Sequence, residues 1–461
     1  MTEIQNLSSE VLEGLALRQL FAGLTKHKVG YAVLRNHEQL PDRVGSRDID
    51  LLVHPDDRAA AHGVAFDLAK EFDLLISDLY HDDMFSSLWL YRRMNDGAPF
   101  TLSIDFFPGR RVYGVELYDV EDALSNLRSH RGIPVVREPF VFLDKWLYHV
   151  MVGQPTPAKY DDLFAGIAER HFDELLAHLE TFLGPEDARK AMRTVRDGRS
   201  STLQPRSVRE RMGMLCARLN LQNLSGPLAF LAYRLRDQFR LRGLFLSISG
   251  PDGAGKTTVI DLVIEQLKAI YGEKAVNYAH FRPTMLPRIA EIAKKARAVE
   301  TVDENYDEPH RAKSSGFAGS AARLVYYWLD YMGGYFRSVH PVLRRREVML
   351  FDRYYYDMIA DSFRSRIALP MPLLRVMGRL LPLPQYAFFI RVDPKEIHRR
   401  KQELTMERIV ELNGRYGDLV RHGWLVPVDN DGAAEAAAAA IVDHIVTDRD
   451  TRARRTLNKG K

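Results

Sequence analysis

Cysteine is almost absent, because the 461 residues contain a single one, Cys216. An internal disulfide needs two cysteines and a structural zinc site usually needs a pair of thiols, so a reducing compartment fits best. Uncharged apolar runs of about 18 residues are also lacking. The start, MTEIQNLSSEVLEGL, is polar and acidic and does not resemble a secretory signal. We therefore expect a cytoplasmic protein with no transmembrane segment.

A large excess of charge of one sign is lacking as well. The 65 basic and 61 acidic residues give a net charge of +4, which implies no polyanionic partner for the whole molecule and no firm nucleic-acid partner. Basic residues gather at 189–242 and 449–461. A solvated helix face and a frayed end are the expected explanation, and contact with phosphate, nucleic acid or anionic lipid is the alternative.

Apolar periodicity predicts a mixed α/β protein with three zones and a tail. Short apolar runs alternate with amphipathic stretches over 1–143, which indicates an α/β domain. Helical spacing dominates 144–242 and predicts a helical connector. Strands alternate with helices over 243–446, so a parallel sheet flanked by helices is expected. We expect 447–461 to form a basic, flexible tail.

The clearest motif is GPDGAGKTT, which lies between the strand-like run LFLSISG and a helical stretch and fits G-x-x-x-x-G-K-[ST]. Glycines let such a loop wrap a phosphate with backbone N–H groups, and the anion then lies at a helix N-terminus. A bare glycine turn would explain neither the lysine nor the threonine. We expect Lys256 to contact the β- and γ-phosphates and Thr257 to ligate Mg²⁺. The predicted nucleotide-binding set is Gly250, Asp252, Gly253, Ala254, Gly255, Lys256, Thr257 and Thr258.

A second motif follows an apolar strand in EVMLFDRYYYD. The carboxyl ends of parallel strands carry the ligand sites of open sheets, so Asp352 could order Mg²⁺ there and Arg353 could hold a transferred phosphoryl group. An Asp-Arg pair tied into a local ion network is the structural alternative. The chain lacks the N-K-x-D motif of GTPases, and transfer to a bound small acceptor is favoured over a switch or motor.

Two further arginine-containing segments complete this prediction. In PKEIHRRKQEL, the side chains of Arg399, Arg400 and Lys401 could close over the γ-phosphate as a catalytic lid, although such a run is equally typical of a solvated face. In HFRPTMLPR, Arg282 follows a probable strand and is a candidate acceptor-binding residue.

These motifs together resemble the thymidylate kinase-like group of P-loop phosphotransferases from about Leu244 to Val446. The resemblance rests on the loop with Asp252, on the D-R-Y triplet ending at Tyr354, and on the arginine-rich lid. It implies phosphoryl transfer from ATP with Mg²⁺, with Asp252, Arg353 and Tyr354 near the acceptor. The stretch from Pro283 to Tyr335 lacks T-R-E-P-G, and it and the lid look more like kinase-like proteins of cell-surface polysaccharide loci, so thymidylate is not the expected acceptor.

Three carboxylates mark the amino-terminal zone. Asp48 and Asp50 alternate with Ile49 on a predicted strand, so both carboxylates project from one face, and Asp105 on another strand could be the third ligand of a Mg²⁺ site. This D-x-D pattern with a distant Asp is similar to the nucleotidyltransferase fold, which implies a catalytic and metal-binding role for all three residues. The alternatives are carboxylates that cap a strand end, or a degenerate regulatory domain.

The sequence thus predicts a Mg-ATP-dependent kinase that phosphorylates a small molecule, either a nucleoside monophosphate or a sugar or sugar phosphate. One alternative is a nucleotidyltransferase whose P-loop domain senses nucleotide. Another is a nucleotide-gated scaffold whose arginine-rich connector docks on a membrane or nucleic acid. A homodimer is compatible with the sequence.

Overall fold

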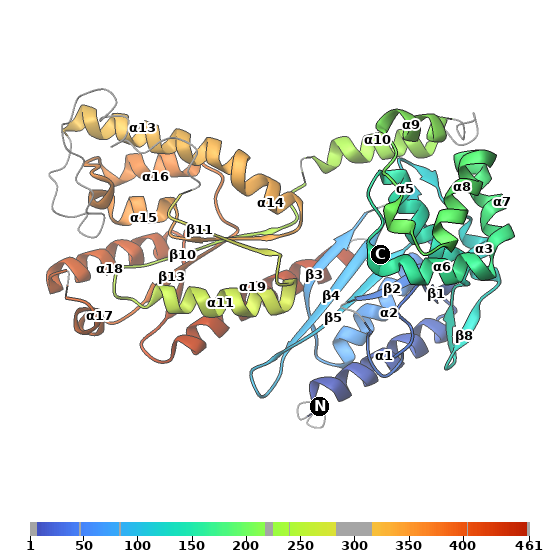
Figure 1. Ribbon diagram of the computed structural model, residues 1–461. Coiled ribbons are helices and arrows are strands. Elements are labelled where there is room, and N and C mark those ends of the chain that lie inside the picture. The colour runs from blue at the N-terminus through green and yellow to red at the C-terminus, as the bar shows by residue number, and fades with distance from the viewer. Residues whose placement is uncertain are drawn as a thin grey trace. The chain divides into compact units, whose positions relative to one another are not determined.

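The computed structural model describes residues 7–45, 48–82, 84–216, 225–238, 240–282, 316–402 and 404–458 (Figure 1). It contains two compact units. Unit 1 comprises Met1–Phe239 and Arg449–Lys461, and unit 2 comprises Arg240–Asp448. The segment expected to be a separate connector, 144–242, belongs to unit 1 up to residue 239, because its helices share a core with the amino-terminal sheet.

Unit 1 is built on a seven-stranded mixed sheet with the order β3-β4-β5-β2-β1-β9-β8. The neighbours β2 and β5 are parallel, and β4 is antiparallel to β5. A separate two-stranded ribbon joins β6 and β7. The strands are β1 (Tyr31–Val33), β2 (Asp48–Val53), β3 (Leu75–His81), β4 (Ser86–Arg93), β5 (Pro99–Phe107), β6 (Arg111–Val112), β7 (Val115–Glu116), β8 (Arg128–His130) and β9 (Ile133–Val135).

Helices cover both faces of this sheet. Ile49, Leu51 and Phe106 pack with α1 (Ser9–Lys26) and α2 (Arg58–Glu71), whereas Leu52 and Phe107 pack with the later helices. Successive strand residues alternate between faces, so Asp48, Asp50 and Asp105 share the second face. The later helices are α3 (Val120–Ser125), α4 (Glu138–Phe142), the π-helical turn η3 (Leu143–Leu147), α5 (Tyr148–Val152), α6 (Asp161–Arg170), α7 (Phe172–Leu183), α8 (Pro185–Arg196), α9 (Val208–Cys216) and α10 (Ser225–Asp237).

Unit 2 contains a five-stranded, wholly parallel sheet with the order β11-β12-β10-β13-β14, which confirms the expected fold class. The central strand is β10. The next two strands in the sequence, β11 and β12, lie on one side of it, and the last two, β13 and β14, lie on the other, so the direction in which strands are added to the sheet reverses at β10. Ligands of open α/β sheets bind at the carboxyl ends of the strands at such a reversal. The strands are β10 (Leu244–Ser249), β11 (Val276–His280), β12 (Val348–Asp352), β13 (Tyr386–Arg391) and β14 (Val426–Asp429).

The helices of unit 2 include α11, which follows the glycine-rich loop directly. Among the described residues, no helix combines the length and the hydropathy needed to cross a membrane. The bounds are α11 (Lys256–Tyr271), α13 (Phe317–Gly334), the π-helical turn η6 (Tyr335–Val339), α14 (His340–Arg344), α15 (Tyr355–Ala360), α16 (Met371–Arg379), α17 (Pro394–Arg400), α18 (Met406–Arg421) and α19 (Ala434–Asn458). The residues of α19 from Arg449 onward belong to unit 1.

The predicted flexible tail, 447–461, is helical as far as Asn458. This segment packs against β3. Arg449 forms an ion pair with Asp78 of β3, and the carboxylate of Asp450 accepts a hydrogen bond from the Ile76 backbone N–H at 3.0 Å. Ala453 enters the core of unit 1. The prediction of a flexible tail was therefore wrong for the described residues, since composition alone could not reveal β3 as a partner.

Candidate active site

The loop between β10 and α11 has a backbone that requires glycine. The φ angles of Gly250, Gly253 and Gly255 are +154°, +88° and +75°. A Cβ atom at Gly255 would lie 2.8 Å from Nδ2 of Asn430, a distance that real Cβ atoms do not tolerate. The carboxamide of Asn430 also donates to the Ala254 carbonyl at 2.8 Å. The loop is therefore held tightly from the end of β14.

Lys256 is the first residue of α11 and is buried. Its ammonium donates to the Pro251 carbonyl at 2.7 Å and lies 3.9 Å from the Asp252 carboxylate. Burial, with the nearby Arg353 charge, lowers the pKa of Lys256 to about 7. A phosphate placed in the loop would favour the charged lysine again, because an adjacent anion stabilises the ammonium. Thr257 and Thr258 are exposed on the same first turn.

Asp352 ends β12, next to Ile248 of β10 and His280 of β11 in the strand register. Its Oδ2 atom accepts from Nδ1 of His280 at 2.9 Å, while its buried Oδ1 has no hydrogen-bond partner among the described residues. Burial raises the pKa of Asp352, but the hydrogen bond from His280 and the charge of Lys256 outweigh it, so the net pKa is lowered. An ionised, buried oxygen without a donor suits a divalent cation or its water.

Arg353 lies at the centre of a buried ion network. Its guanidinium donates to Asp357 at 2.8 Å and to Asp252 at 2.6 Å, and Arg364 donates to Asp252 at 2.8 Å. Burial raises the pKa of Asp252, but Arg353, Lys256 and Arg364 together hold it well below its usual range. Asp252 is thus an anion held in place within the glycine-rich loop, and Arg353 contributes to its position.

The three cationic residues predicted to form a lid end helix α17. Arg399 and Arg400 both pair with Glu396, at 2.7 and 2.8 Å, but Arg399 is largely exposed. A Cβ atom at Gly253 would lie 3.1 Å from Cβ of Lys401, and one at Gly255 would lie 3.5 Å from the Arg400 guanidinium. The end of α17 therefore lies against the loop, with Arg400 closer to it than its neighbour.

Two predicted acceptor residues have different surroundings. Arg282 follows β11 and donates to the fully buried Asp330 at 2.6 Å, with its guanidinium 4.9 Å from the ring centroid of Tyr327. Tyr354 is completely buried, and its hydroxyl donates to the Pro382 carbonyl at 2.8 Å. The ring packs in the core, and the contact of Tyr354 with substrate stays a prediction. Residues 283–315 of the predicted acceptor region lie outside the described residues.

Three residues of this site were missed in the sequence. The Asp357 carboxylate accepts hydrogen bonds from the Arg353 guanidinium and from two hydroxyls, those of Ser249 at 2.6 Å and Tyr416 at 2.7 Å. His280 ends β11, and Asn430 follows β14. The rule that ligand sites lie at the carboxyl ends of parallel strands would have drawn attention to His280 and Asn430. Asp357 carries no such signal.

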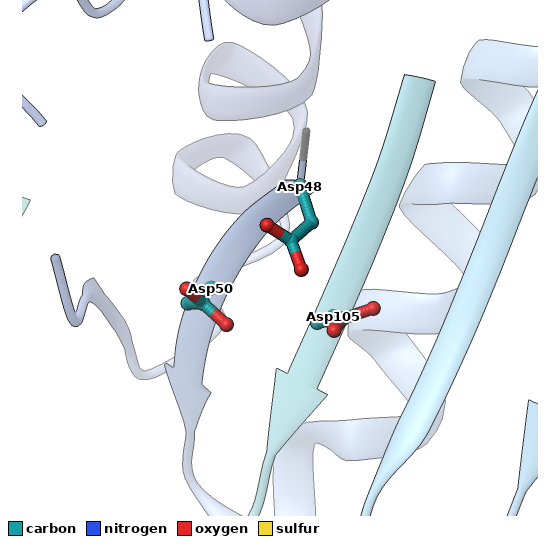
Figure 2. Close-up of side chains that lie close together, drawn as sticks. All are labelled: Asp48, Asp50 and Asp105. Carbon is teal, nitrogen blue, oxygen red and sulfur yellow. The ribbon is translucent and has the colours of Figure 1, made fainter. Parts of the chain in front are cut away.

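The three predicted carboxylates of unit 1 lie together. Asp50 lies opposite Asp105 in the register of the parallel strands β2 and β5. Asp48 precedes Asp50 on β2 and points to the same face of the sheet. One oxygen from each lies within 4.8 Å of the others, and Figure 2 shows the side chains converging from the two strands. Oxygen-only clusters of this kind suit Mg²⁺ or Mn²⁺.

The same cluster is held by cations and hydroxyls from neighbouring elements. Arg35 bridges Asp50 at 2.8 Å and the fully buried Asp144 at 2.9 Å, and Ser87 donates to Asp105 at 2.7 Å. Burial, opposed by Arg35 but reinforced by Asp48, raises the pKa of Asp50 to about 6. A bound divalent cation would offset this cost of burying negative charge.

The chain is similar to thymidylate kinases over about two fifths of its length. A probable thymidylate kinase of Staphylothermus marinus is 26% identical over 195 residues, which are 41% of this chain and 86% of the relative. The thymidylate kinase of Bacillus pumilus is 28% identical over 195 residues, 40% of this chain and 81% of the relative. No protein-family model matches the chain.

The match to a solved thymidylate kinase from Ehrlichia chaffeensis covers 44% of this chain and 97% of that chain, with 16% identity and a TM-score of 0.30. The similarity to the curated relatives supports an ATP-dependent phosphotransferase. The roles of the individual residues, and the nucleotidyltransferase-like character of unit 1, stay predictions.

Proposed function

We propose that unit 2 transfers the γ-phosphoryl group of Mg-ATP to a small acceptor, in the first place a nucleoside monophosphate. The observation that carries the proposal is the glycine-lined loop with the buried Lys256 beside it and the unpartnered Oδ1 of Asp352 at the neighbouring strand end. The similarity to thymidylate kinases supports the phosphotransferase class and a nucleotide as acceptor. A sugar or sugar phosphate is the competing acceptor.

The chain's own groups would divide the work as follows. Backbone N–H groups of the loop and the Lys256 ammonium hold the β- and γ-phosphates, while the Thr257 hydroxyl and Asp352 fit the shell of Mg²⁺, which neutralises phosphate charge when bound. Arg400 lies close enough to the loop to stabilise charge that develops on the phosphoryl group. Asp252, which is paired with Arg353 and Arg364, would contact the acceptor.

The direct test is Lys256→Ala with Lys268→Ala as matched control, because Lys268 lies on the same helix and pairs with Glu273 instead. We expect Lys256→Ala to lower kcat/KM for ATP by at least about a hundredfold, since a charge contact to the transferring group is lost. Transfer from radiolabelled ATP to a panel of nucleoside monophosphates, sugars and sugar phosphates measures activity and acceptor together. Near-normal turnover by Lys256→Ala would contradict the proposal.

The carboxylate cluster favours a second candidate function, metal-dependent nucleotidyl transfer by unit 1 with the P-loop unit as nucleotide sensor. It rests on three oxygens within 4.8 Å and on the raised pKa of Asp50. Mn²⁺ titration followed by electron paramagnetic resonance should show a site that Asp50→Asn removes and Lys256→Ala retains. If Asp50→Asn leaves Mn²⁺ binding unchanged, this candidate fails and the kinase proposal is untouched.

A further inference from the structure

Helix α10 of unit 1 carries an apolar face that points into solvent. Leu228, Leu231 and Leu235 are 65%, 56% and 57% exposed, and their i, i+3, i+7 spacing places them on one side of the helix. Isolated exposed leucines are ordinary on protein surfaces, but three in a row along one helix face form a continuous strip.

The opposite face of α10 is firmly anchored, so the orientation of the helix is fixed within unit 1. A Cβ atom at Gly226 would lie 2.3 Å from the Gly114 carbonyl oxygen, which shows that the two backbones touch. The ring of Phe230 packs edge-on against Tyr113 with centroids 5.5 Å apart, and the Tyr233 hydroxyl donates to Asp82 at 2.8 Å. The leucines therefore cannot turn inward without breaking these contacts.

Charge borders the leucine strip on both sides. Arg234 and Arg236 are exposed and, at about 100° per residue, lie on opposite borders of the strip. The one acidic residue of the helix, Asp237, lies on the anchored side. Leucines between two arginines, with no carboxylate on the outer face, suit an apolar layer beneath a layer of negative charge.

We propose that α10 docks unit 1 on an anionic lipid bilayer, with the three leucines among the acyl chains and the two arginines among the headgroup phosphates. The helix has 13 residues and lies far short of a spanning length, so it would lie in the plane of the interface. Three leucines and two arginines predict weak, reversible and salt-sensitive binding. The inference does not depend on the proposed kinase activity.

Co-sedimentation of the full chain with vesicles tests this proposal. We expect binding to phosphatidylcholine vesicles that contain about 30% phosphatidylglycerol, and at least about tenfold weaker binding without the anionic lipid or at roughly 0.5 M salt. Leu231→Glu and the double variant Arg234→Ala/Arg236→Ala should each lower vesicle affinity at least about tenfold. In Leu231→Trp, the fluorescence of the added tryptophan should shift to shorter wavelength when the protein binds the anionic vesicles.

Matched controls carry the same chemical changes elsewhere. Val410→Glu adds a carboxylate at another exposed apolar helix position, and Lys190→Ala/Arg193→Ala removes two exposed charges from α8. Both should bind vesicles like the unmodified protein, and far-UV circular dichroism should show all variants folded. Absent binding, or equal binding by Leu231→Glu, overturns the proposal. Dimers that Leu231→Glu dissociates without any vesicle binding would overturn it in favour of a second copy of the chain.

Discussion

The sequence predicts that Arg353 holds a transferred phosphoryl group, whereas in the structure its guanidinium contacts two carboxylates. Its backbone has a φ of +70°, a strained value for a residue with a side chain, and its guanidinium is almost completely buried between Asp252 and Asp357. An arginine held by two carboxylates is rigid and already neutralised. It is therefore better placed to orient Asp252 than to move with the phosphoryl group.

His62 gives unit 1 a predicted sensitivity to acid. It is buried against Ser86, and burial, with the neighbouring His81 and Arg58, lowers its pKa to about 3. Because the unfolded histidine takes a proton near pH 6.5 and the folded one does not, stability falls as the pH drops below that value. The loss from this residue should reach roughly 2 kcal/mol at pH 5.

Urea unfolding of unit 1 across this pH range checks the prediction. His62→Gln should remove most of this loss, because no buried imidazole then remains neutral in the folded state. His27→Gln, at an exposed position, removes a histidine without touching the buried site. An unchanged pH slope in His62→Gln would show that other groups cause the acid sensitivity.

The residues that sequence could identify are those whose role follows from local spacing. Gly250 to Thr257 form a contiguous pattern, and Asp48, Asp50 and Asp105 stand out because acids are unusual on strands that are otherwise apolar. Arg35 and Asp144 could not be predicted, because they reach the carboxylate cluster of unit 1 through contacts between segments far apart in the sequence. Tyr354 was assigned to substrate because of its place in a triplet, and its burial is a property of packing.

At the scale of helices and strands, the amphipathic pattern predicted most elements, but it did not predict which other elements they pack against. The segment 447–461 was expected to be a flexible tail, yet helix α19 continues through it to Asn458 and contacts β3. The helices between 144 and 239 show the same limit. Their apolar faces predict burial, but only the register of β2 and β5 shows that Leu52 and Phe107 complete their core.

The contact between α19 and β3 predicts a stabilising role for Arg449. Its ion pair with Asp78 is mostly buried, with side-chain exposures of 16% and 9%. Arg449→Ala should lower the free energy of unfolding of unit 1 by about 2–4 kcal/mol, because it removes one member of a buried pair. Arg455→Ala, an exposed position on the same helix, should change it by less than about 0.5 kcal/mol. Equal effects of the two substitutions would contradict the assigned contact.

For the whole molecule, two compact units predict two separable responses to ligand. Differential scanning calorimetry should resolve two transitions, and Mg-ATP at a hundredfold excess over its Kd should stabilise one of them by about 2.7 kcal/mol. That transition should be the one that Lys256→Ala leaves unresponsive, since the loop belongs to unit 2. A shift of both transitions by the same amount would show that the units unfold as one.

Because Arg449, Asp450 and Ala453 follow unit 2 in the chain yet pack in unit 1, the second unit is an insertion within the first. During synthesis, the strand β3 is made long before the helix end that covers it. On the ribosome, unit 2 can therefore finish folding before residues 449–461, the last part of unit 1, have been synthesised.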